Sequence, residues 1–248
     1  MMDAANQDPA SKWELAQASL EGTRGLQQNY KLAFSLFHDL ANVELSQDSH
    51  KIPLEKEGNE NDNQQQQQGS SNACFSPAMK AIAQCYLEGK GVEKDTEAGV
   101  AWLRSAYNMG DDIDAAHDLA MIYEYGKFSV ENDIFAAAEW LKKAANGGHI
   151  EAMAELGLCY ELGCGVEQSD TEALDWYTKA ANLGHITSKF SVAEAFEEAR
   201  GVPQSDEEAC IWYYKAAIEG DHDSKMALRR LEEIARIVVP GVRAILDV

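Results

Sequence analysis

A repeat of 36 to 38 residues runs through most of this chain and constrains its fold more than any other feature. The tryptophans Trp102, Trp140, Trp176 and Trp212 are separated by 38, 36 and 36 residues. Two further columns keep the same spacing: the glycines Gly110, Gly148, Gly184 and Gly220, and the valines Val92, Val130, Val166 and Val202. Because three residue types share one register, we interpret the repeat as a structural unit.

Each repeat contains two helical patterns separated by a glycine-containing turn. In the third repeat, Ala152, Leu156 and Tyr160 lie on one face of a first helix. Trp176 and Ala180 lie on one face of a second helix. A single helical hairpin cannot cover its own apolar face, so the hairpins must stack on one another. We therefore expect the tryptophans to fill the space between repeats.

The repeat resembles the Sel1-like repeat family, a relative of the tetratricopeptide repeat. Residues 152–166 read Ala-x3-Leu-Gly-x2-Tyr-x2-Gly-x-Gly-Val, and residues 173–184 read Ala-x2-Trp-Tyr-x-Lys-Ala-Ala-x2-Gly. The match is strong over residues 75–220. The resemblance implies an all-α fold, a right-handed α/α superhelix (solenoid) of stacked Sel1-like helical hairpins.

The ends of the chain and one internal segment depart from the repeat. We predict the following organisation: a degenerate N-terminal repeat or cap (1–45), a disordered Gln/Asn-rich insertion (46–74), four repeats (75–110, 111–148, 149–184, 185–220), and a C-terminal partial repeat with a capping helix at 242–246 (221–248). The insertion has too few apolar residues to form a core. Single-residue insertions near Asp112 and after Gly126 lengthen the 38-residue unit.

Charge and cysteine content limit the function classes. The formal net charge of −21 disfavours binding to nucleic acid or to an anionic membrane. We find no apolar run long enough for a transmembrane helix and no signal-peptide pattern. The five cysteines include no CxxC motif and predict reduced thiols in the cytoplasm. Some bacterial Sel1-like proteins bridge the two helices of a repeat, but here the second-helix position is alanine, so the resemblance implies no such disulfide.

The sequence contains no recognised catalytic or phosphate-binding motif, and we expect no catalytic, cofactor-binding or metal-binding residues. His149 and His185 each follow the last glycine of a repeat and predict loop or cap residues, because neighbouring repeats lie too far apart to share one zinc ion. Cys164 lies in a predicted turn and is the candidate reactive thiol.

The variable positions of the first helices are the candidate partner-binding residues. They are nearly all acidic or amide: Gln84, Glu88, Asp118, Glu124, Glu155, Glu161, Glu194 and Glu197. If they line a groove, they favour a basic peptide or protein face. The competing interpretation is that they only keep the surface solvated.

The functional prediction is a non-enzymatic scaffold or adaptor that binds a partner protein or peptide through the solenoid groove. The resemblance implies the same, since eukaryotic Sel1-like proteins look like adaptors in quality-control and signalling complexes. One alternative is a regulatory subunit of an enzyme complex. Another is a hydrolase of the β-lactamase-like kind described for some bacterial relatives, which needs an activated nucleophile that the sequence does not display. The oligomeric state stays open.

Overall fold

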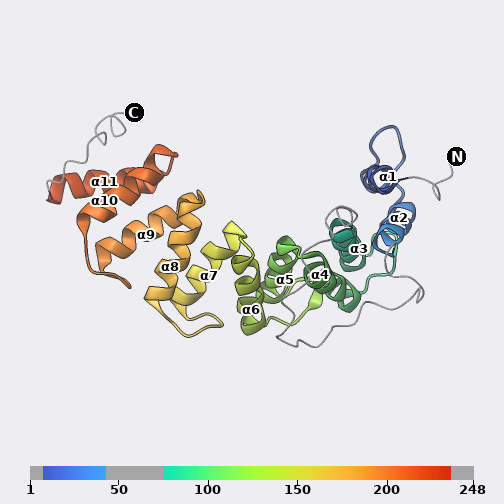
Figure 1. Ribbon diagram of the computed structural model, residues 1–248, viewed down its shortest axis with the longest axis horizontal. Helices are drawn as coiled ribbons and strands as arrows, with labels where there is room; N and C mark the ends of the chain where they lie inside the picture. Colours follow the sequence, from blue (N-terminus) through green and yellow to red (C-terminus); the bar gives the residue numbers. More distant parts are fainter. Residues whose placement is uncertain (1–7, 43–74, 236–248) are drawn as a thin grey trace, which may run out of the picture. The chain divides into compact units, whose positions relative to one another are not determined.

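The structure, a computed structural model, describes residues 8–42 and 75–235, and these residues form helices joined by short turns (Figure 1). The predicted insertion at 46–74 and the predicted helix at 242–246 lie outside the described residues. The chain divides into two compact units, Met1–Asn132 and Asp133–Val248. The division falls within the second predicted repeat, between its two helices.

The described helices of each unit follow one another in a simple order. The first unit contains α1 (Pro9–Glu21), α2 (Tyr30–Asn42), α3 (Phe75–Glu88), α4 (Thr96–Gly110), α5 (Ile113–Tyr125) and the 3-10 turn η3 (Lys127–Ser129). The second unit contains α6 (Ile134–Asn146), α7 (Ile150–Leu162), α8 (Asp170–Asn182), α9 (Ile186–Glu198), α10 (Asp206–Ile218) and α11 (His222–Ala235). Within each unit every helix packs against the next one in sequence, as expected for stacked hairpins.

Polar side chains cap the second helices and fix where they begin. The side chain of Ser169 accepts a hydrogen bond from the backbone N–H of Glu172 at the start of α8, and Ser205 does the same at the start of α10. The N–H of Ser169 also donates to the carbonyl of Tyr160 at 2.9 Å, which ties the start of the second helix to the first. Ser169 therefore marks the start of α8.

The second glycine of the turn motif allows close contact between successive repeats. Gly165 has a φ of +69°, and a Cβ placed there would collide with the carbonyl of Ile134, the first residue of α6. Gly91 and Gly201 stand in the same relation to Tyr30 and Asp170, the first residues of α2 and α8. Glycine is therefore required at these positions for conformation and for space.

Tryptophan and tyrosine side chains join neighbouring repeats. Trp212 packs against two buried clusters, one containing Ala173, Tyr177 and Val192, the other containing Tyr213 and residues of α11. Trp102, Trp140 and Trp176 are buried. The core is thus a series of contacts between hairpins, in which small residues allow helices to approach closely. Gly157 is one such residue, because a Cβ there would lie 2.8 Å from the Tyr177 ring.

A candidate binding cavity in the first unit

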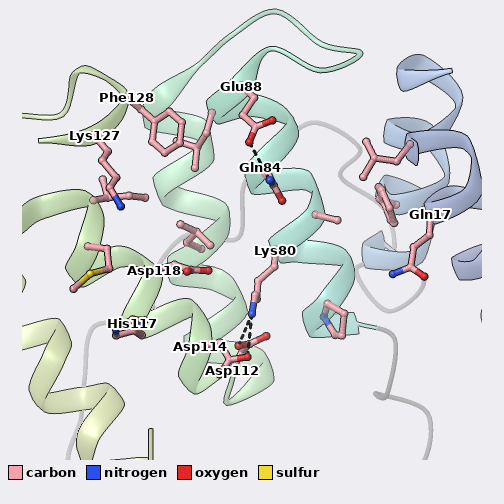
Figure 2. A pocket seen from close by; sticks show the side chains of 18 of the residues that line it. Gln17, Lys80, Gln84, Glu88, Asp112, Asp114, His117, Asp118, Lys127 and Phe128 are labelled. Carbon is pink, nitrogen blue, oxygen red and sulfur yellow. Dashed lines mark hydrogen bonds and ion pairs between the residues drawn. The ribbon is translucent and has the colours of Figure 1, made fainter. Parts of the chain in front are cut away.

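A cavity of about 640 Å³ opens on the first unit, between the first helices of successive hairpins (Figure 2). Helices α1, α3 and α5 and the turn η3 supply most of its wall. The residues that line it are Trp13, Gln17, Leu20, Glu21, Phe37, Pro77, Lys80, Ala81, Gln84, Leu87, Glu88, Leu103, Asp112, Asp114, His117, Asp118, Met121, Ile122, Lys127 and Phe128. We call this space the first-unit cavity.

The apolar part of the cavity belongs to the hydrophobic core and extends outward from it. Phe37, Leu87, Leu103 and Ile122 are at most 5% exposed, and they also line the cavity. Trp13 stacks obliquely on Phe37 with 5.2 Å between the ring centroids. A half-buried apolar wall above a buried floor is the usual setting for a partner's side chain.

Charged side chains surround this apolar surface, and acids outnumber lysines. The lining includes Glu21, Glu88, Asp112, Asp114 and Asp118 against Lys80 and Lys127, which gives a formal charge of −3. Figure 2 shows the ammonium of Lys80 pointing toward Asp112 and Asp114, at 3.5 and 3.3 Å. The cavity therefore favours a partner with positive charge.

The pKa values of two acids in the cavity, Glu88 and Asp118, shift in opposite directions. Gln84 donates a hydrogen bond to Glu88 at 2.9 Å across one turn of α3, and Glu88 also pairs with Lys90 at 2.5 Å. These contacts lower the pKa of Glu88. By contrast, the surrounding protein displaces water from Asp118 and raises the pKa of its carboxyl, although Lys80 acts against this rise. A cationic group beside Asp118 would stabilise its ionised form.

The turn at η3 contributes an aromatic side chain through a strained backbone. Phe128 has φ +57° and ψ +25°, and Ser129 has φ +70°. Val130 aligns with Val92 and Val166, so Ser129 occupies the position that is glycine in those repeats. Left-handed backbone at a bulky residue costs about 1–3 kcal/mol. The hydroxyl of Thr96 donates to the carbonyl of Phe128 at 2.8 Å and holds this turn in place.

The structure distributes the eight candidate residues among different environments. Gln84, Glu88 and Asp118 line the first-unit cavity together. Glu124 and Glu155 are half-buried on α5 and α7. The remaining acids, Glu161, Glu194 and Glu197, belong to the second unit, where charged partners surround them.

Glu161 joins α7 to α8 and to the turn after α9, and Glu197 joins α9 to α10 and α11. The phenol of Tyr177 donates to Glu161 at 2.7 Å, and the guanidinium of Arg200 pairs with the same carboxylate. Thirty-six residues later, Tyr213 donates to Glu197 at 2.9 Å, and Arg230 contacts both carboxylate oxygens at 2.5 and 2.6 Å. These two acids hold neighbouring hairpins together, and each is already engaged by an arginine within the fold.

Glu194 has the same cationic neighbour as Glu161. Its carboxylate lies 3.6 Å from Arg200, which also pairs with Glu198 at 3.0 Å. Burial raises the pKa of Glu194, and the cation of Arg200 opposes this rise.

Sequence reasoning missed the most informative residues of the cavity. Trp13 and Lys80 follow no repeated column, and the acids that pair with Lys80 come from the next hairpin. Phe128 was signalled more clearly, because it lies in the insertion after Gly126, where the repeat gains one residue. The one-residue insertion in an otherwise regular repeat was thus the sequence signal for an unusual turn at η3.

The structure places the predicted histidine caps at the starts of helices and the described cysteines in different environments. His149 and His185 accept hydrogen bonds through Nδ1 from the N–H groups of Ala152 and Ser188, each at 3.2 Å, and so cap α7 and α9. Cys85 and Cys210 are buried free thiols, and burial raises the pKa of each to about 11. Cys164 is also a free thiol, and it is exposed. No metal-binding cluster of histidine, cysteine or acidic residues occurs within residues 8–42 and 75–235.

Comparison with known proteins agrees with this class of helical-repeat fold. A model of the Sel1 repeat matches residues 9–41, 76–111, 113–149, 150–185 and 188–221, which together form most of the chain. The chain belongs to the Sel1 repeat family. The resemblance to Sel1-like repeats and the all-α stack of helical hairpins, both predicted from the sequence, are confirmed.

Solved structures with the same fold come from bacteria. One is c5321, a protective antigen of uropathogenic Escherichia coli with an SLR fold, matched at a TM-score of 0.72 and 22% identity over 96% of this chain and 44% of the antigen. This chain therefore spans less than half of the antigen's length. Another is a Sel1 repeat protein from Oxalobacter formigenes, with a TM-score of 0.63 and 23% identity over 100% of this chain and 87% of that protein. At these identities the comparisons show the fold alone.

Sel1 repeat proteins are generally scaffolds for protein interactions. Among the helices that the structure describes, none combines the length and the apolar character needed to cross a bilayer.

Proposed function

We propose that this protein is a non-enzymatic interaction scaffold that binds a segment of a partner protein in the first-unit cavity. The observation that carries the proposal is the cavity itself, in which a buried apolar floor lies beneath a rim of net negative charge. An apolar centre with a polar rim is the usual anatomy of a protein-binding surface. The net charge of the rim favours a partner segment with basic residues.

The contacts of the second unit support placing the site in the first. Glu161 and Glu197 are matched by Arg200 and Arg230 within the fold. Using them for a partner would require breaking contacts that join hairpins. In the first-unit cavity, Gln84 and Asp118 are exposed and lie on neighbouring first helices, α3 and α5, so a partner reaches them without disturbing the stack.

The proposed cellular setting is the cytoplasm. Cys85, Cys164 and Cys210 are free thiols, and burial shields Cys85 and Cys210 from oxidation. Free thiols of this kind are typical of a reducing compartment.

Site-directed photo-crosslinking tests this proposal. Benzoylphenylalanine placed at position 84, inside the cavity, should yield a discrete adduct in an extract of the source cells, and the purified partner should reproduce that adduct. The same amino acid at position 142, an exposed site on α6, is the matched control. Ala81→Arg, which fills the cavity from α3, should abolish the adduct at position 84. An adduct that forms only from position 142, or that survives Ala81→Arg, would contradict the proposed site.

A further inference from the structure

The strained turn at η3 is the feature that distinguishes the first-unit cavity from a plain inter-repeat groove. The turns after α3 and α7 use the sequence Gly-x-Gly-Val with glycine at both positive-φ positions, and the turn after α9 keeps the second glycine, Gly201. Here Phe128 and Ser129 carry positive φ instead, and an extra residue is present. A glycine at either position would fold more easily, so the side chains themselves require an explanation.

Phe128 lines the cavity together with apolar side chains of α5. It is half-buried, and the apolar side chains of Met121 and Ile122 line the same cavity from α5. Figure 2 shows Phe128 and Lys127 at one side of the cavity, with Gln17 of α1 at the other and α3 between them. The ring therefore adds apolar surface where the wall meets solvent.

The acids lie along the same cavity rather than on a separate surface. Glu88 projects from the end of α3, and Asp118 projects from the middle of α5. Lys80 is shared between Asp112 and Asp114 at the beginning of α5. An occupant that touches Phe128 thus meets a carboxylate on either of two helices.

We propose that Phe128 is a specificity-determining anchor, and that the partner segment presents a bulky apolar side chain to it together with a lysine or arginine for Asp118. This inference rests on the proposed function and adds the chemistry of the occupant. The strain of the turn is retained because the inserted residue places an aromatic ring in the cavity. An acidic or purely polar segment fits neither the ring nor the negative rim.

Peptide selection on the full chain tests the inference. The probe is a positional-scanning library of mixed synthetic peptides, selected on the immobilised protein, and the selected peptides are then measured with variants by fluorescence anisotropy. The expected preference is a bulky apolar residue within a few positions of lysine or arginine. Selection of acidic or wholly polar peptides would overturn the inference.

The variants separate the ring from the backbone that carries it. Phe128→Gly removes the ring and relieves the positive φ, so we expect an equal or higher melting temperature and roughly tenfold weaker binding. Ser129→Gly, the matched control, relieves strain in the same turn and should leave binding unchanged. Asp118→Asn should weaken binding severalfold, whereas Glu93→Gln, on an exposed turn outside the cavity, should not.

The outcomes distinguish this inference from the proposed function. If Phe128→Gly binds like the parent protein while Ala81→Arg loses binding, the anchor is wrong and the cavity remains the site. If binding survives both substitutions, the cavity is not the site and both proposals fail. If no peptide is selected above background, both proposals fail as well.

Discussion

At the level of single residues, the repeats use either aspartate or histidine to cap the first helix of a hairpin. Asp112, His149, His185 and Asp221 occupy equivalent positions and cap four first helices, each accepting a hydrogen bond from an N–H three residues further on. Asp is the better cap, because its charge also complements the positive end of the helix. The histidines are thus structural residues with room for improvement.

The cap at His185 leads to the first prediction. His185→Asp should stabilise the protein, and His185→Ala should cost about 1 kcal/mol of unfolding free energy because the N–H of Ser188 loses its acceptor. Urea denaturation followed by circular dichroism measures both. His222→Ala is the matched control, since His222 follows the capping residue of α11 and is exposed. Equal stabilities for the Asp and Ala variants at position 185 would show that this cap contributes little.

Ala199 offers a second test at this scale. It ends α9 with φ +60°, at a position where the equivalent residues Gly89, Gly126 and Gly163 are glycine. Ala199→Gly should therefore stabilise the protein by about 1 kcal/mol, because the left-handed conformation penalises a Cβ atom. Ala154→Gly within α7 should instead destabilise by about the same amount. If both substitutions shift the urea midpoint in the same direction, the backbone argument is wrong.

At the level of helices, repeated polar contacts connect one hairpin with the next. Glu197 on α9 accepts from Tyr213 on α10 and pairs with Arg230 on α11. Tyr213 is 1% exposed, so its phenol depends on that carboxylate. Burial, and then the hydrogen bond to Glu197, raise the pKa of Tyr213. The contact is therefore a structural link between consecutive helices.

A double-mutant cycle measures that link. Glu197→Ala should cost more than Tyr213→Phe, because it leaves a buried phenol without its acceptor. The two substitutions together should show a coupling of about 1–2 kcal/mol in urea denaturation. Pairing Glu197→Ala with Tyr177→Phe, in the preceding hairpin, is the control and should give additive effects. A coupling near zero for the first pair would contradict the assigned role of Glu197.

The sequence predicts helices well here and side-chain partners poorly, for a physical reason. Columns such as Trp176 and Gly163 reflect contacts that every repeat makes, so spacing alone predicts the hairpins. The partner of Glu161 is Arg200, thirty-nine residues away on a turn whose equivalent residues are Lys90 and Cys164. Such a pair follows no period, so its acid resembles a solvated surface residue until the fold is known.

At the level of the whole molecule, the chain forms two compact units. Within each unit, the contacts between helices join elements that follow one another in sequence. Stability in such arrays is approximately a sum of local terms. A defect should therefore be felt most in the hairpins that contain it. The tryptophan column offers matched sites for this test, because Trp102 lies in the first unit and Trp176 in the second, and both are at most 8% exposed.

Trp176→Ala should remove about 3–5 kcal/mol of stability. Amide hydrogen exchange should then rise first in α7–α10, with α3 and α4 remaining protected. Trp102→Ala should give the reverse pattern. A uniform rise throughout the described helices in both variants would show that the chain unfolds as one cooperative block.

The first-unit cavity is also a property of the assembled stack, because three hairpins contribute to it. Trp13 comes from the first hairpin, Gln84 from the second and Asp118 from the third. No single repeat contains the site, which explains why repeat columns alone did not define it. The candidate residues of the second unit are instead largely engaged in holding that unit together.

The most direct test of this account is amide hydrogen exchange of the full chain with and without the peptide selected on it. We predict protection in α3, in α5 and in residues 126–130, and little change in α8–α11. The Ala81→Arg variant should show no protection at the same peptide concentration. Protection confined to α6–α11 would contradict the assignment of the binding site to the first-unit cavity.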